Sequence, residues 1–167
     1  MPTWALAVSY WLHLIATVIW IGGLALMALV VWPGARALLG PGPQLNALVQ
    51  QWQKRFNPLA WASLAVLTAT GLFQTVANPH YGGFLRIDNA WAAAILIKHL
   101  AVIGMVVIGV YMQVVLQPEI ARVALLHERG RAAENTGALR RRESALTWLN
   151  LLCALITLAC TAIATAL

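Results

Sequence analysis

The chain has 167 residues, of which 61% are hydrophobic and only 10% are charged. Soluble domains carry about 25% charged residues, so the composition excludes an ordinary soluble protein and indicates an integral membrane protein. The net charge of +6 could suggest a nucleic-acid partner. However, nine of the eleven Lys and Arg residues lie in two loops that flank apolar segments, which signals orientation in a membrane. The expected partner is the lipid bilayer, and no nucleic acid.

The first apolar segment spans about residues 4–32 and carries no charged side chain. A helix needs about 20 apolar residues to cross a bilayer, so this segment is long enough. His13 lies near its middle, and Ser9, Thr17 and Trp20 fall on the same helical face. Because an ionisable side chain is costly inside a membrane helix, His13 is a candidate functional residue.

Three more apolar segments are predicted to be membrane helices, at about 57–77, 90–117 and 144–166. Asn57 and Pro58 form a typical helix start, and Ser63, Thr70 and Gln74 share one face of the second segment. Pro33 and Pro118 are expected to end the first and third segments. The loop at 33–56 contains apolar residues at helical spacing, which predicts a short amphipathic helix on the membrane surface.

Lys and Arg are concentrated in the loops at 33–56 and 118–143. The positive-inside rule places these two loops in the cytoplasm, and therefore both termini outside. The predicted fold is all-α: a transmembrane four-helix bundle, up-down-up-down, forming a single membrane domain over residues 1–167.

With this topology, His99 in the third segment lies at the same depth as His13, about nine residues in from the outer end of its helix. At a rise of about 1.5 Å per residue, both histidines would lie roughly 13 Å deep. Each is followed by Leu, and ten residues later by Gly. This echo suggests that the two helix pairs form a parallel repeat.

Two ligands fit two histidines at one depth. If the helices lie diagonally across the bundle, the span suits a b-type haem with two axial imidazoles. If they are adjacent, the span suits a metal ion such as copper, or a simple hydrogen-bonded pair. Haem propionates would need cations near the outer face, and Arg86, Lys98 and His80 are available there.

Structural roles compete with each of these assignments. A buried histidine is often only hydrogen-bonded to Ser or Thr, and Lys98 could extend its ammonium to the outer interface. Met105, Met112 and Cys160 could be soft copper ligands, but such residues usually fill a core. His127 is assigned no role.

Four short features of the sequence stand out: His13 followed by Trp20-x-Gly22-Gly23, Arg55-Phe56 leading to Gly71, Lys98, and Glu143 before the last segment. Together they resemble the CopD-type membrane domain of copper resistance proteins. A more distant likeness is to the HemJ-type protoporphyrinogen oxidases, which share a histidine on the first helix and a lysine on the third. The resemblance implies copper handling or haem binding in a multi-pass protein of the bacterial cytoplasmic (inner) membrane. His99 departs from the CopD pattern, and this departure favours haem.

The leading hypothesis is therefore a b-type haem (haem b) held by His13 and His99, with Lys98 and Arg86 near its propionates, for electron transfer or haem-linked redox chemistry. The alternatives are a copper-binding or copper transport protein that uses the same histidines, and a HemJ-like porphyrinogen oxidase. Whether the protein is an enzyme is left open. An electron-transfer haem implies a redox protein or quinone as partner, and faces of small residues are compatible with a homodimer.

Overall fold

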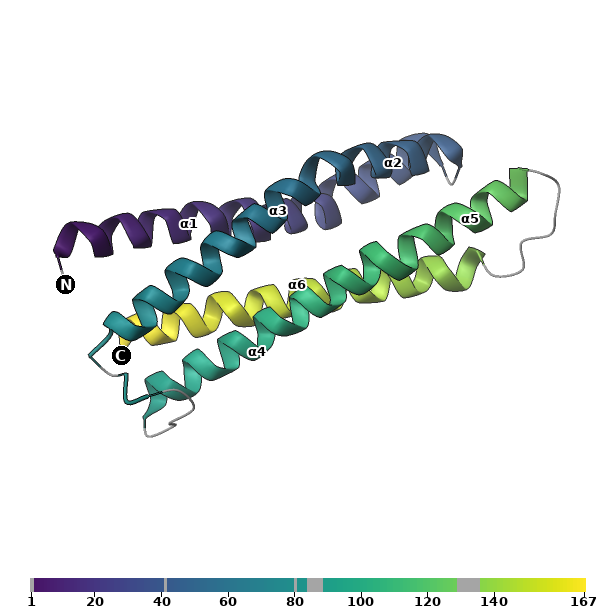
Figure 1. Cartoon of the computed structure of the whole chain (residues 1–167). Helices are drawn as coiled ribbons and strands as arrows, with labels where there is room; N and C mark the ends of the chain where they lie inside the picture. The colour runs from purple at the N-terminus through teal and green to yellow at the C-terminus, as the bar shows by residue number, and fades with distance from the viewer. Residues whose placement is uncertain (1, 41, 80, 84–88, 129–135) are drawn as a thin grey trace. The chain divides into compact units, whose positions relative to one another are not determined.

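The computed structural model describes residues 2–40, 42–79, 81–83, 89–128 and 136–167, and every regular element in these ranges is a helix (Figure 1). The chain divides into two compact units, Met1–Ala92 and Ala93–Leu167. The all-α prediction is confirmed. Each unit consists of a long segmented helix followed by a helix that returns along it.

Unit 1 begins with three helical segments that follow one another without a break: α1 (Thr3–Leu26), the π-helix η1 (Met27–Val31) and α2 (Trp32–Leu39). After a short turn, α3 (Pro43–Ala77) runs back along them and packs mainly against α1. Unit 1 is thus a long antiparallel hairpin of two helices.

Unit 2 repeats this arrangement. The order is α4 (Ala90–Tyr111), the π-helix η2 (Met112–Leu116), α5 (Gln117–Glu128) and then α6 (Thr136–Ala166). The returning helix α6 packs against η2 and α5, and Gly104 of α4 faces the Sγ atom of Cys153 on α6.

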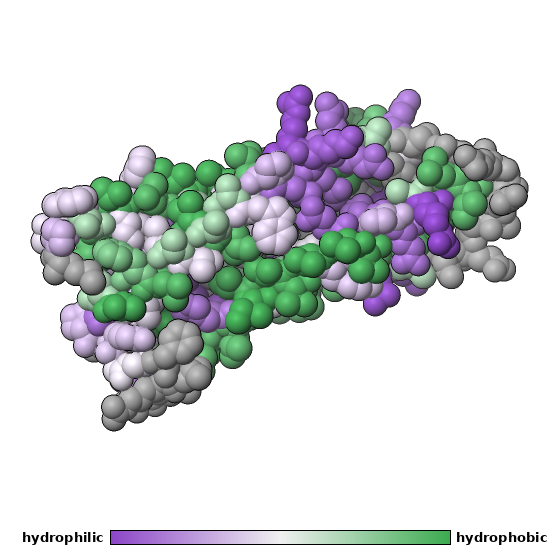
Figure 2. Space-filling model, in the orientation of Figure 1, coloured by the Kyte–Doolittle hydropathy of each residue, from purple (hydrophilic) through white to green (hydrophobic). Residues whose placement is uncertain are grey.

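Among the residues that the structure describes, four stretches of helix are long and apolar enough to cross a membrane, as predicted: Thr3–Leu39, Ala47–Ala77, Ala90–Val123 and Gly137–Ala166. Large apolar side chains remain exposed along them, as expected where lipid is the solvent. Figure 2 shows this apolar surface, with hydrophilic residues gathered near α2 and the first turns of α3.

The helices continue through two prolines that were expected to end them. Pro33 lies within α2, and Pro118 lies within α5. A helical proline normally clashes with the carbonyl four residues earlier and removes one hydrogen bond. Here those carbonyls belong to Leu29 and Val114, inside η1 and η2. The wider π turn explains why each helix can continue past its proline.

The second span also begins earlier than predicted. The expected start at Asn57 is wrong, because α3 is one 35-residue helix that contains Pro58 in its interior. The predicted amphipathic segment forms the first turns of this helix. It buries Leu45 and Val49, so these residues serve packing within unit 1 rather than contact with a membrane surface.

The two units share a register as well as an order of elements. The start of the π-helix, the proline after it and two buried small residues of the first helix all recur at a spacing of 85 residues: Met27 and Met112, Pro33 and Pro118, Ser9 and Ala94, Ala16 and Ala101. This register differs by one residue from the predicted echo, in which His13 and His99, and Gly23 and Gly109, are 86 residues apart.

The orientation in the membrane remains a prediction from loop charge. A reporter fused after Leu167 should behave as external, and one inserted near Gly137 should behave as cytoplasmic. Paired phosphatase and fluorescent-protein fusions at these two positions measure this directly. The reverse pattern would refute the assignment of both loops to the cytoplasm.

Candidate functional site

In unit 1, the polar face of α1 meets the polar face of α3. Nδ1 of His13 lies 2.8 Å from Oγ1 of Thr70. One turn away, Nε2 of Gln74 donates to Oγ of Ser9 at 3.2 Å. Ser9 and Thr70 are buried, and His13 is half-buried. The sequence placed these residues on separate helical faces, and the structure brings the two faces together.

The hydrogen bonds around Thr70 determine which nitrogen of His13 carries the proton. The Thr70 hydroxyl lies 2.6 Å from the carbonyl oxygen of Val66, to which it must donate because a carbonyl only accepts. Its oxygen then accepts from Nδ1–H of His13. Nδ1 of His13 therefore carries a proton, which makes Nε2 the ring nitrogen able to bind a metal ion when the imidazole is neutral.

Gly71 and Thr17 complete the surroundings of this histidine. A Cβ atom at Gly71 would lie 3.5 Å from Cε1 of His13, so the ring lies directly over the glycine backbone. The Thr17 hydroxyl donates to the His13 carbonyl oxygen at 2.8 Å within α1. Packing and hydrogen bonding together hold the imidazole in one orientation.

The Gly22-Gly23 motif of α1 and the Arg55-Phe56 motif of α3 also contact each other within unit 1. The Phe56 ring occupies the position that a Cβ atom at Gly23 would take. Phe56 also stacks on Trp52, with ring centroids 5.9 Å apart. Gly23 is thus required for close approach of α1 and α3, which explains why a glycine and a Phe appear in these motifs.

In unit 2, the adjacent residues Lys98 and His99 point in different directions. Lys98 is half-buried and close enough to Cys160 of α6 to interact with it electrostatically. His99 is exposed, and its Nδ1–H donates to the carbonyl oxygen of Ile95 at 2.7 Å. Arg86 and His80 lie outside the described residues.

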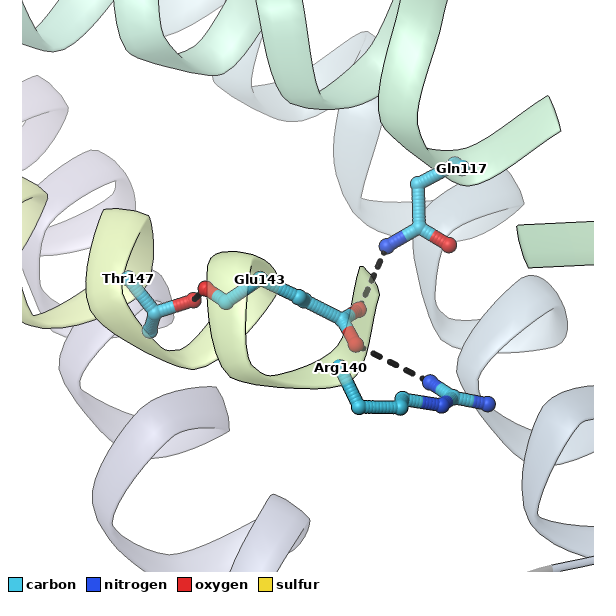
Figure 3. A network of polar contacts seen from close by, with 4 residues as sticks. All are labelled: Gln117, Arg140, Glu143 and Thr147. Carbon is cyan, nitrogen blue, oxygen red and sulfur yellow. Dashed lines mark hydrogen bonds and ion pairs between the residues drawn. The ribbon is translucent and has the colours of Figure 1, made fainter. Parts of the chain in front are cut away.

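Unit 2 also contains a buried carboxylate whose partners were not predicted. Glu143 is 6% exposed. As Figure 3 shows, its Oε1 accepts from Nε2 of Gln117 at 2.8 Å, and its Oε2 accepts from Nη1 of Arg140 at 2.9 Å. The Thr147 hydroxyl donates to the Glu143 carbonyl oxygen at 2.9 Å. This network ties the start of α5 to the start of α6.

Two of the three consecutive arginines at the start of α6, Arg140 and Arg142, also contact other side chains. Arg140 pairs with Glu143, and the Arg142 guanidinium lies 5.2 Å from the ring centroid of Tyr111. Only the i, i+3 spacing of Arg140 and Glu143 was a visible signal in the sequence. The partners Gln117 and Tyr111 come from the preceding span, so no local pattern could indicate them.

These observations define a multi-pass, all-helical membrane protein with an oriented histidine between its first two spans. Residues 50–164 match the family model of Copper resistance protein D, so the chain belongs to the CopD family. The matched residues begin within α3, and α1 with His13 lies before them. Comparison with curated proteins and with solved structures gave no match.

The family points to copper and gives no support to a b-type haem. His13 lies in unit 1 and His99 lies in unit 2, so a ligand shared by the two histidines stays a prediction. Within the described residues, no group of three or more His, Cys, Asp or Glu side chains could hold a metal ion. The family match alone makes copper, the alternative hypothesis from the sequence, better supported than haem.

Proposed function

We propose that this CopD-family protein binds a copper ion as cargo within its membrane spans, and that His13 supplies the ligand of unit 1. The proposal rests on one observation, the orientation of the His13 imidazole by Thr70. It is supported by the family match to Copper resistance protein D. We propose the bacterial cytoplasmic membrane as the location, with the loops at 33–56 and 118–143 inside.

The chemistry of His13 suits copper. A neutral imidazole is a good ligand for copper ions. A hydrogen bond from the other ring nitrogen fixes the tautomer and orients the lone pair, as outer-shell partners do in metal sites. In unit 1 the hydrogen-bond partner of His13 is Thr70, which is uncharged. The site is therefore built without a carboxylate, in keeping with a span that carries no charged side chain between Thr3 and Ala35.

A site with few protein ligands is suited to cargo rather than to a permanent cofactor. Each additional ligand slows release, and a transported ion must leave. The spans of unit 2 contain soft donors, Met105 and Cys160, both buried. They are candidates for further steps in copper handling, and the proposal assigns neither of them to the His13 site.

The test compares two threonines of α3. Thr70→Val removes the acceptor of His13, whereas Thr68→Val removes an exposed hydroxyl that donates to the Leu64 carbonyl at 2.8 Å. Cu(I) affinity, measured by competition with bicinchoninate in detergent, should fall at least tenfold for Thr70→Val, since losing an outer-shell partner costs roughly 10–100-fold. Thr68→Val should match the wild type, and His13→Ala should abolish the competing site.

Three results would each refute the proposal. The first is a wild-type protein that competes for no Cu(I), and the second is a His13→Ala variant with unchanged affinity. The third is a coloured preparation whose reduced-minus-oxidised spectrum shows a b-type haem that disappears in His13→Ala. The spectrum should also be taken on intact membranes, so that loss of a ligand during extraction is detected.

A further inference from the structure

A hollow of about 350 Å³ opens on unit 1, away from the His13 site. It is lined by Val31 of η1 and by side chains of α3, chiefly Trp52, Arg55, Phe56 and Leu59. Its walls are almost entirely apolar, apart from Gln51 and the Arg55 guanidinium. Its size lies at the lower end of the roughly 300–1,000 Å³ typical of small-ligand sites.

The wall of this hollow is held in place by packing. Phe56 is fixed on one side by Gly23 of α1, where its ring occupies the space of an absent Cβ atom. On the other side it stacks on Trp52 at a centroid distance of 5.9 Å. A hollow with walls held in this way is formed before its ligand arrives, which reduces the entropy cost of binding.

The charge pattern along α3 indicates where the hollow lies relative to the bilayer. From Leu59 to Ala77 the helix has no charged residue, whereas Lys54 and Arg55 come just before this stretch. Arg55 therefore marks the level of the lipid headgroups, and Leu59 lies on the hydrocarbon side. An arginine fork binds phosphate oxygens with two hydrogen bonds.

We propose that the hollow holds one acyl chain of an anionic phospholipid, with the lipid phosphate bound by Arg55. The apolar lining and the cation at its edge match the two ends of such a molecule. Lys54 carries the same charge on the neighbouring residue but does not line the hollow, so it provides a matched control for charge alone.

The experiment uses the purified full-length chain, stripped of lipid in detergent and then mixed with phosphatidylglycerol or phosphatidylcholine of equal chain length. Bound lipid is counted by native mass spectrometry. The wild type should retain phosphatidylglycerol in preference to phosphatidylcholine. Arg55→Gln should reduce retention of phosphatidylglycerol roughly tenfold, as expected for hydrogen bonds to a charged group, and Lys54→Gln should leave it unchanged.

A second variant tests the hollow itself. Leu59 is 55% exposed, so Leu59→Trp can fill the hollow without disturbing a core. It should lower retention of both lipids. Excess inorganic phosphate should not displace phosphatidylglycerol, because the buried acyl chain contributes affinity that inorganic phosphate lacks. Equal losses for Arg55→Gln and Lys54→Gln, unchanged retention in Leu59→Trp, displacement by phosphate, or no lipid held by the wild type would each overturn the proposal.

Discussion

Gly23→Ala should markedly lower the thermal stability of the protein in detergent. The added methyl group would overlap the Phe56 ring, which is already held by stacking on Trp52. Inserting atoms into a well-packed contact typically costs about 1–3 kcal/mol. Separation of α1 from α3 at this point should also shift the wall of the lipid hollow. The measurement is the unfolding temperature, followed by thiol accessibility or light scattering.

The neighbouring glycine is the control. A Cβ atom at Gly22 would meet nothing within 4 Å. In a helix, Ala is favoured over Gly by about 1 kcal/mol, so Gly22→Ala should be neutral or slightly stabilising. In a Phe56→Ala background, Gly23→Ala should lose most of its effect, because the overlapping ring is gone. Equal destabilisation by the two glycine variants, or the same Gly23→Ala effect in both backgrounds, would contradict the assigned contact.

Glu143→Ala should destabilise unit 2 by about 2 kcal/mol. The substitution leaves the amide of Gln117 without its carboxylate and breaks the ion pair with Arg140. Hydrogen bonds to charged groups contribute about 1.5–3 kcal/mol each. The expected loss of stability is about 2 kcal/mol rather than the sum of two such bonds, because the Arg140 side chain is 27% exposed and water can partly replace its bond to Glu143. Thermal unfolding in detergent measures the change.

Two matched variants isolate this network. Glu119 is an exposed carboxylate on α5, and Glu119→Ala should change stability by less than about 0.5 kcal/mol. Arg141 is exposed beside Arg140, so Arg141→Gln should be silent where Arg140→Gln is destabilising. If Glu143→Ala proved no worse than Glu119→Ala, the buried carboxylate would not be the tie between α5 and α6.

Much of the fold could be predicted, because helices that are solvated by lipid need long apolar segments that are easily recognised in the sequence. Four long runs with few charges are enough to locate four spans. Helical spacing also identified the polar faces that carry His13 on α1 and Thr70 on α3. These two faces do meet, since polar side chains in an apolar solvent find each other across helices.

Other features of the fold and of the candidate site could not be predicted, because they depend on contacts between residues that are distant in sequence. Pro33, Pro58 and Pro118 indicated breaks, yet the helices run through all three, twice directly after a π-helix. The match in depth between His13 and His99 indicated a shared site. That site stays a prediction, because depth does not specify the direction of a side chain around its helix. The partners of Glu143 are distant in sequence, so only folding could reveal them.

The common register of the two units also pairs two nitrogen-containing side chains that interact differently with a cation. A shift of 85 residues superimposes η1 on η2 and Pro33 on Pro118. The same shift places His13 on Lys98, not on His99. Unit 1 therefore has an imidazole at this turn, and unit 2 has an amine that repels cations whenever it is protonated. The two units have the same order of helical elements but different nitrogen groups at this shared position.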